Sequence, residues 1–146
     1  MAEALPCDLE EITEPKSRTG FIGYMRSAME ALQKRPAVIA AKQRDVAAYD
    51  LVIVGTPVWG SSLSSPVRAY LMATAAQLPD VAFFCSLGGM GSESTFAQMT
   101  AIIGKRPRAV CAIRQSEVQV GTIGGLLSTF EKALSTTSTN AGSAKV

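Results

Sequence analysis

The sequence predicts an α/β fold in which helices cover both faces of a parallel sheet, giving three layers. Three short runs of apolar residues, at 50–56, 81–85 and 109–113, have the length and composition of strands buried on both faces. Each run is followed by a segment whose apolar residues have helical spacing. Strands and helices that alternate in this way are typical of a doubly wound sheet with right-handed connections.

The first of these strands leads into the most distinctive stretch of the chain. We expect it to end at Gly55-Thr56-Pro57, because proline cannot donate to a strand ladder. The following loop holds Trp59, the single tryptophan of the chain. A helix over residues 65–77 is expected next, since Ser64-Ser65-Pro66 offers a capping serine and a proline for the first turn. Ligands of open parallel sheets lie at the carboxyl ends of the strands, so we expect a ligand beside Trp59.

The remaining elements are predicted from apolar spacing and turn residues. Residues 7–12 alternate between apolar and polar, which indicates an edge strand, and residues 13–20 indicate a loop. A helix is expected from residue 21 until Pro36 stops it, and another from about Ser94 to Gly104, with Thr95 and Gln98 at capping-box spacing. The last helix is expected over about 118–134, where three glycines weaken its first half.

Composition excludes several classes of protein. The chain has 146 residues, 47% hydrophobic and 18% charged, which suits one domain over residues 1–134 with a disordered Ser/Thr-rich tail at 135–146. It has no histidine, which excludes hydrolases that pair histidine with serine or cysteine, and the usual mixed zinc sites. A net charge of +2, with scattered lysines and arginines, predicts no nucleic-acid partner.

Targeting and cysteine usage point to a reducing compartment. No apolar run approaches the ~20 residues of a membrane span, and no signal peptide is apparent, so we expect a cytoplasmic protein without membrane association. Cys7, Cys85 and Cys111 lie far apart and form no C-x-x-C motif. We expect reduced, buried thiols that behave as small apolar residues.

Two stretches resemble the flavodoxin-like family, which includes flavodoxins and NADPH-dependent FMN reductases. The first is the run from Tyr49 to Trp59, continued by Ser64-Ser65-Pro66-Val67-Arg68. The second is Phe84-Cys85-Ser86-Leu87-Gly88-Gly89-Met90-Gly91 with Thr95-Phe96-Ala97-Gln98-Met99, and the likeness runs from about Ala2 to Leu134. The resemblance implies an FMN site at the carboxyl edge of a five-stranded sheet.

The same resemblance implies which residues contact the flavin. Trp59 would lie against the isoalloxazine ring, where a flat aromatic side chain contributes burial and dispersion. Glycines of the second loop would let the backbone approach the polar edge of the ring. The implied cofactor-binding residues are Thr56, Pro57, Val58, Trp59, Gly60, Ser86, Leu87, Gly88, Gly89 and Gly91. No catalytic side chain is required, because the flavin carries the electrons. From the residues alone, two alternatives stay open: Trp59 as a core residue, and the glycines as a turn before a helix.

The family's first strand and its phosphate-binding loop have no counterpart in the chain. Residues 1–5 resemble the end of the helix that follows that loop, so the sequence reads as an N-terminally truncated domain that lacks the central strand. Ser17-Arg18-Thr19-Gly20 has the composition of a phosphate loop, but acidic residues and Pro15 precede it where a buried strand is needed. Three explanations stay open: a truncated FMN protein, a remnant whose edge strand closes the gap, or a homodimer in which another chain fills it.

Two functions therefore compete. The first is a flavodoxin-like redox protein that binds FMN for electron transfer or for reduction of a small acceptor, with weakened affinity and an unknown redox partner. The second is a cofactor-free interaction module, or truncated remnant, with the same fold. A dinucleotide fingerprint at residues 89–94 is rejected, because a third glycine and the acid about 20 residues later are both missing.

Overall fold

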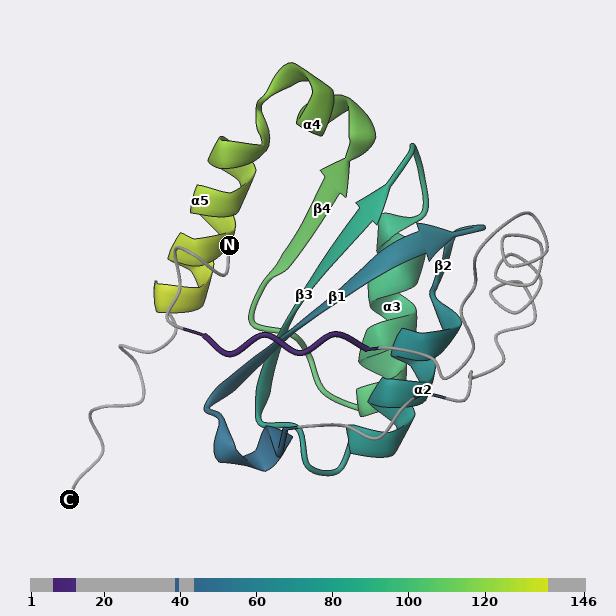
Figure 1. Cartoon of the computed structure of the whole chain (residues 1–146), viewed down its shortest axis with the longest axis vertical. Coiled ribbons are helices and arrows are strands. Elements are labelled where there is room, and N and C mark those ends of the chain that lie inside the picture. The colour runs from purple at the N-terminus through teal and green to yellow at the C-terminus, as the bar shows by residue number, and fades with distance from the viewer. Residues whose placement is uncertain (1–6, 13–38, 40–43, 137–146) are drawn as a thin grey trace.

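Three parallel strands form the sheet of the computed structural model, which describes residues 7–12, 39 and 44–136. They are β1 (Leu51–Trp59), β3 (Asp80–Leu87) and β4 (Val110–Arg114) (Figure 1). A two-residue strand, β2 (Ser62–Leu63), pairs antiparallel with the end of β1, so the strand order is β2-β1-β3-β4. These strands coincide with the three apolar runs, because β-branched and aromatic side chains suit a pleated surface covered on both sides.

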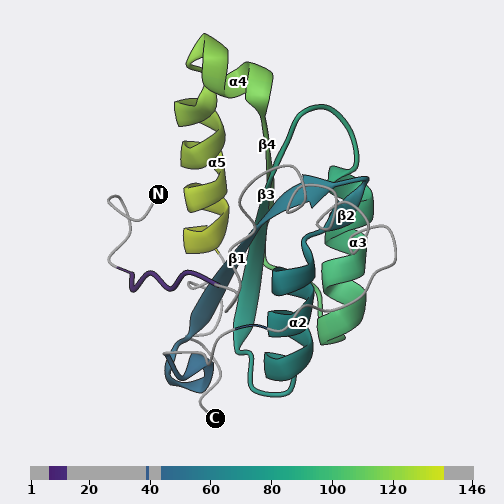
Figure 2. The same ribbon diagram turned by 45° about the vertical axis from the view of Figure 1, so that its right-hand side comes forward.

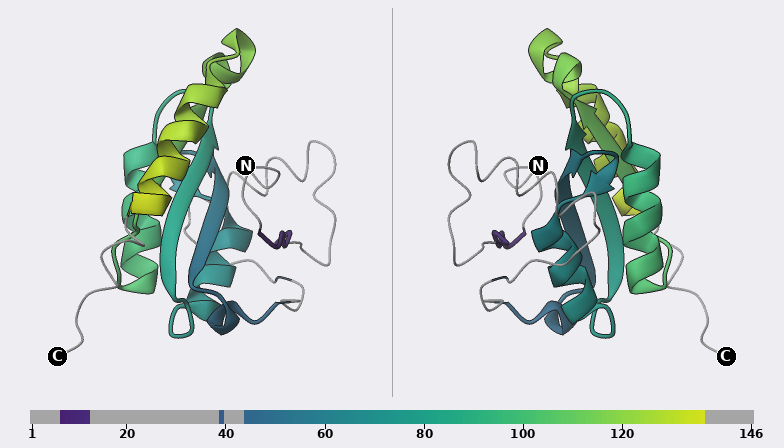
Figure 3. Two further views of the ribbon diagram at one scale, coloured as in Figure 1. Left: turned by 90° about the vertical axis from the view of Figure 1, so that its left-hand side faces the viewer. Right: turned by 90° about the vertical axis from the view of Figure 1, so that its right-hand side faces the viewer.

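Helices cover both faces of this sheet, as the sequence predicted. Helices α2 (Ser65–Thr74) and α3 (Ser92–Ile103) lie on one face and α5 (Ile123–Thr136) on the other (Figure 2). The short helix α4 (Gln115–Val120) projects past the strand ends (Figure 3), and the 3-10 helix η1 (Val46–Ala48) precedes β1. The α/β three-layer fold is therefore confirmed.

Two apolar clusters hold the layers together. Phe83, Leu71 and Met99 are fully buried between the sheet and helices α2 and α3. On the other face, Ala82 and Cys111 pack against residues of α5, including Phe130. Side chains that alternate along β3 therefore serve the two cores in turn, as a strand buried on both faces requires.

Two details of the strand ends were predicted wrongly. Strand β1 continues past Pro57 to Trp59, and β2 was not expected at all. Proline is compatible with an edge strand, and within the described residues β1 has no strand partner on its outer side over residues 51–57. The chain then reverses through Gly60 and Ser61, whose φ angles of 55° and 59° are those of a type I′ hairpin turn.

Helix boundaries also differ from the prediction, and α2 ends at Thr74 rather than at residue 77. The spacing of Thr95 and Gln98 does not form a capping box: α3 begins at Ser92 after Gly91, and the Thr95 hydroxyl donates to the Gly91 carbonyl at 2.8 Å. The predicted last helix is two helices, α4 and α5, which are separated at Gly121, where φ is 76°. Helix α5 ends at Thr136, two residues beyond the predicted end.

Residues 7–12 form no strand, which corrects the prediction of an edge strand there. One side chain of this segment does contact the start of the described domain. The Asp8 carboxylate accepts a hydrogen bond from the Tyr49 hydroxyl at 2.7 Å and pairs with Arg44 at 3.1 Å. Alternating polarity indicates that one face of a segment is exposed to solvent. It does not indicate whether another strand lies beside that segment to pair with it. The loop at 13–20, the helix at 21–36 and most of the tail lie outside the described residues.

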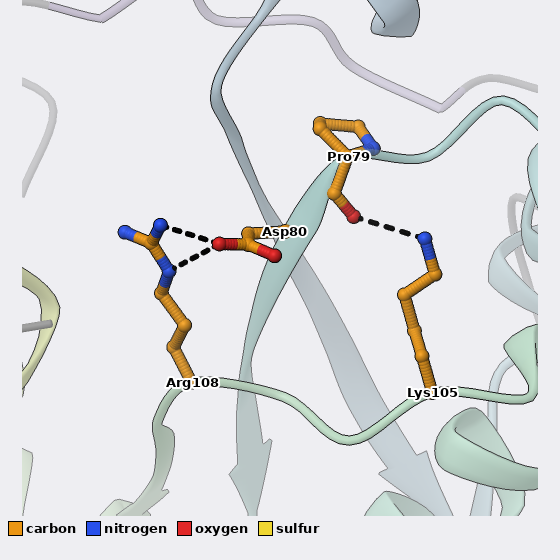
Figure 4. A network of polar contacts seen from close by, with 4 residues as sticks. All are labelled: Pro79, Asp80, Lys105 and Arg108. Atoms are coloured by element: carbon orange, nitrogen blue, oxygen red, sulfur yellow. Dashed lines mark hydrogen bonds and ion pairs between the residues drawn. The ribbon is translucent and has the colours of Figure 1, made fainter. Parts of the chain in front are cut away.

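Two cationic side chains, Arg108 and Lys105, contact residues at the amino-terminal end of β3. Arg108 pairs with the Asp80 carboxylate, to which its Nε donates at 2.8 Å (Figure 4). Lys105 donates to the carbonyls of Pro79 at 3.2 Å and Leu78 at 2.5 Å. A ligand is expected at the carboxyl edge of the sheet. These charges lie at the opposite end.

Cys85 and Cys111 are free, buried thiols, as predicted, whereas Cys7 is exposed. Burial raises the pKa of the Cys85 thiol to about 11, so it is protonated near neutral pH and poorly nucleophilic. Among the helices that the structure describes, none combines the length and apolar character needed to cross a bilayer.

Candidate functional site

An open groove runs along the carboxyl edge of the sheet, where β1, β3 and β4 end. Its volume is about 520 Å³, within the range of pockets that hold small molecules. Three consecutive residues at the end of β1, three at the end of β3, and four from β4 and α4 line it. They are Pro57, Val58, Trp59, Ser86, Leu87, Gly88, Ile113, Gln115, Val118 and Gln119.

The first wall of the groove is the end of β1. Pro57, Val58 and Trp59 lie there, and the Trp59 side chain is half-buried. The type I′ turn after Trp59 brings the chain back as β2, so this wall is part of a hairpin rather than a free loop. Gly60 belongs to that turn and does not line the groove.

Thr56 was predicted to frame the flavin, but the structure gives its side chain another partner. The buried Thr56 hydroxyl accepts a hydrogen bond from the Ser64 backbone N–H at 3.1 Å. Ser64 is the N-cap residue of α2, but its side chain makes no capping hydrogen bond. Thr56 therefore joins the end of β1 to the start of α2, and it is not among the residues that line the groove.

The second wall is the end of β3 together with the first residue of the loop that follows it. Ser86, Leu87 and Gly88 line the groove, whereas Gly89 and Gly91 do not. A Cβ atom at Gly88 or Gly89 would meet no atom of the described chain within 4 Å, so open space lies beside this backbone. Gly91 has a different role: its φ is 106°, and a Cβ there would lie 2.6 Å from the Ser61 Cα.

The third wall, from β4 and α4, was missed by the sequence analysis. Ile113 is the last but one residue of β4, and Gln115, Val118 and Gln119 belong to α4. Helix α4 begins at once because the Glu117 carboxylate accepts from the Arg114 backbone N–H at 2.6 Å, an N-terminal capping contact. The signal was present in the sequence, since a glutamate three residues after the strand end favours a helix start there.

The groove is apolar and uncharged. None of the ten lining residues has an ionisable side chain, and those with polar side-chain groups are Trp59, Ser86, Gln115 and Gln119. The nearby charges of Arg114 and Glu117 pair with each other at 3.6 Å. Within the described part of the chain no cluster of side chains is suited to a metal ion. Such a groove can bind a flat neutral group and contact its polar edge.

Comparison with solved structures finds a protein with a similar fold. A flavoprotein from Lactobacillus acidophilus, crystallised in complex with FMN, superimposes with a TM-score of 0.59. The two chains are 22% identical over 74% of this chain and 75% of that chain. The chain has a flavodoxin-like fold. No protein-family profile and no curated protein sequence matches it.

The flavodoxin-like fold places six of the predicted residues in one groove. Pro57, Val58 and Trp59 meet Ser86, Leu87 and Gly88 there, although a gap of 26 residues separates the two stretches in the chain. Parallel pairing causes this, since Pro57 is in register with Ser86. The other four predicted residues lie outside the groove lining, and contact of any of the ten with a cofactor remains a prediction.

Proposed function

We propose that this chain is a flavodoxin-like protein that binds FMN and uses it for electron transfer or for reduction of a small acceptor. The observation that carries the proposal is the groove in which the end of β1, with Trp59, faces the glycine loop after β3. The complex of the L. acidophilus flavoprotein with FMN supports the choice of cofactor. The residues present also fit the ring of a flavin.

The fit is clearest at the ring-binding walls. Trp59 offers a flat aromatic surface, and Val58 and Val118 offer apolar contact. Space beside Gly88 and Gly89 leaves room for a polar ring edge, and the backbone N–H groups of Gly89 and Met90 have no hydrogen-bond acceptor within the described residues. Gln115 and Gln119 can both donate and accept, which suits a ring edge that carries both kinds of group.

The phosphate of FMN is less well provided for. Within the described residues no serine- or glycine-rich loop with a cation borders the groove, and Ser17-Arg18-Thr19-Gly20 lies outside them. Each charge-assisted hydrogen bond to a phosphate contributes about 1.5–3 kcal/mol, so a site without them binds weakly. We therefore expect a dissociation constant in the micromolar range, several orders of magnitude weaker than a complete site would give.

Each wall would have its own part in the redox function. Bound FMN would supply the one- or two-electron chemistry, and the chain's own residues would bind and orient it. Trp59 would cover a face of the ring, and the backbone of residues 88–90 would donate hydrogen bonds to its polar edge. Because none of the described lining residues is ionisable, the protons that accompany the electrons would be exchanged with water.

The competing proposal is a cofactor-free interaction module with the same fold. This proposal is favoured because, within the described residues, no site for an anion such as phosphate borders the groove. Homodimerisation, cytoplasmic location and the absence of a nucleic-acid partner remain predictions.

Titration of FMN with the purified chain separates the two proposals. We expect flavin fluorescence to be quenched at micromolar protein, and riboflavin to bind within a few-fold of FMN, because the ring contributes most of the affinity. A chain that is folded by circular dichroism yet leaves flavin fluorescence unchanged up to roughly 1 mM would favour the cofactor-free module.

A further inference from the structure

A buried arginine lies between β2 and α3 without a carboxylate partner in the described residues. Arg68, on α2, is 7% exposed, and burial lowers the pKa of its guanidinium. Its Nη2 donates to the Gln98 Oε1 at 2.6 Å and to the Ser62 hydroxyl at 3.1 Å, while its Nε has no acceptor. A buried cation without an anion is costly, so the placement of Arg68 calls for a role.

Arg68 determines how Gln98 is oriented. A guanidinium can only donate hydrogen bonds, so it requires the amide oxygen of Gln98 to face it. The Ser62 hydroxyl donates to the same oxygen at 2.7 Å. The amide nitrogen must then point the other way, where it donates to the Ser61 carbonyl at 3.3 Å and the Ser94 hydroxyl at 3.2 Å.

This amide joins the two walls of the groove. Ser61 is in the turn that follows Trp59, and Gln98 is on α3, which begins directly after the glycine loop. A second contact reinforces the first, because the backbone of Gly91 packs closely on Ser61. The turn behind Trp59 is therefore attached to the helix behind Gly88 and Gly89.

We infer that Arg68 and Gln98 are positioning residues, which hold the Trp59 wall at a fixed place relative to the glycine loop. In that role they determine the width of the groove and its affinity for a flat ligand. The identity of that ligand rests on the proposed FMN function, whereas the positioning of Trp59 does not. Neither residue lines the groove, so their effect reaches a ligand only through the two walls.

Gln98→Glu tests the inference. A glutamate keeps an oxygen for Arg68 and Ser62 and adds a counter-charge, but it cannot donate to the Ser61 carbonyl. We expect the thermal midpoint to stay the same or rise, while acrylamide quenching of Trp59 in the flavin-free protein increases roughly two-fold because the turn is released. FMN affinity should fall roughly ten-fold. If the role of Gln98 were purely structural, FMN affinity would fall only when the thermal midpoint also fell. In a positioning role, FMN affinity falls while the thermal midpoint is maintained.

Two further variants serve as controls. Ala97→Glu adds the same charge at the neighbouring exposed position of α3, and should leave Trp59 quenching and FMN binding unchanged. Arg68→Met removes the group that orients the amide and replaces a buried charge with an apolar side chain, so it should fold and also raise Trp59 quenching.

The outcomes are distinct. Wild-type Trp59 quenching in folded Gln98→Glu and Arg68→Met would overturn the positioning role. Absence of FMN binding to the wild type would contradict the proposed function instead, and the flavin-free quenching would still decide whether these residues position Trp59.

Discussion

Trp59→Ala is expected to weaken FMN binding by roughly thirty-fold, which corresponds to the loss of about 2 kcal/mol of aromatic contact. The substitution removes the largest flat surface in the groove. Because the side chain is only half-buried, the folded state should lose little stability. Isothermal titration calorimetry of the variant against FMN measures the change.

Two control variants test whether the loss of FMN affinity is due to the aromatic side chain at position 59. Trp59→Phe keeps an aromatic surface and should retain most of the affinity. Met72→Ala removes another exposed apolar side chain, on α2 and outside the groove, and should leave binding unchanged. Equal affinity of the wild type and Trp59→Ala would show that the ring lies elsewhere.

Gly91→Ala is expected to destabilise the fold by about 3 kcal/mol, of which ~1–2 kcal/mol is the cost of a side chain at positive φ. The remainder arises because the new Cβ would lie 2.6 Å from the Ser61 Cα, a backbone atom that cannot rotate away. The clash would also push the turn behind Trp59 away from α3. Urea unfolding followed by circular dichroism measures the loss.

Gly104 provides a matched control at the other end of the same helix. Its φ is 70°, but a Cβ there would meet nothing within 4 Å. Gly104→Ala should therefore incur only the conformational cost, about 1 kcal/mol. Equal losses in the two variants would contradict a packed contact between Gly91 and Ser61.

The strands of this fold could be predicted because their residues leave few alternatives. Runs such as Leu51-Val52-Ile53-Val54 are too apolar for a surface and too short for a buried helix. Strand β2 could not be predicted, since it depends on Ser61 adopting a positive φ without the usual Asn-Gly signal of a hairpin. Residues 7–12 show the opposite case, in which a strand-like pattern forms no strand in the structure.

The candidate site could be predicted in outline, because the carboxyl ends of neighbouring parallel strands meet at one edge. The direction of each side chain could not. Thr56 and Pro57 are adjacent, yet one contacts α2 and the other lines the groove. The wall formed by α4 was missed because the helix was expected to begin later, and the amide link through Gln98 joins residues that only the fold brings together.

Chemical-shift mapping of the ¹⁵N-labelled chain during FMN titration tests the central claim most directly. The chain has one tryptophan, so its indole N–H gives a single resonance for residue 59. We expect the largest shifts at this resonance and at the amides of residues 58–59, 86–90 and 113–119, with none near Asp80 and Arg108 at the opposite end of the sheet. Shifts confined to another surface, or none at saturating FMN, would contradict a flavin site in this groove.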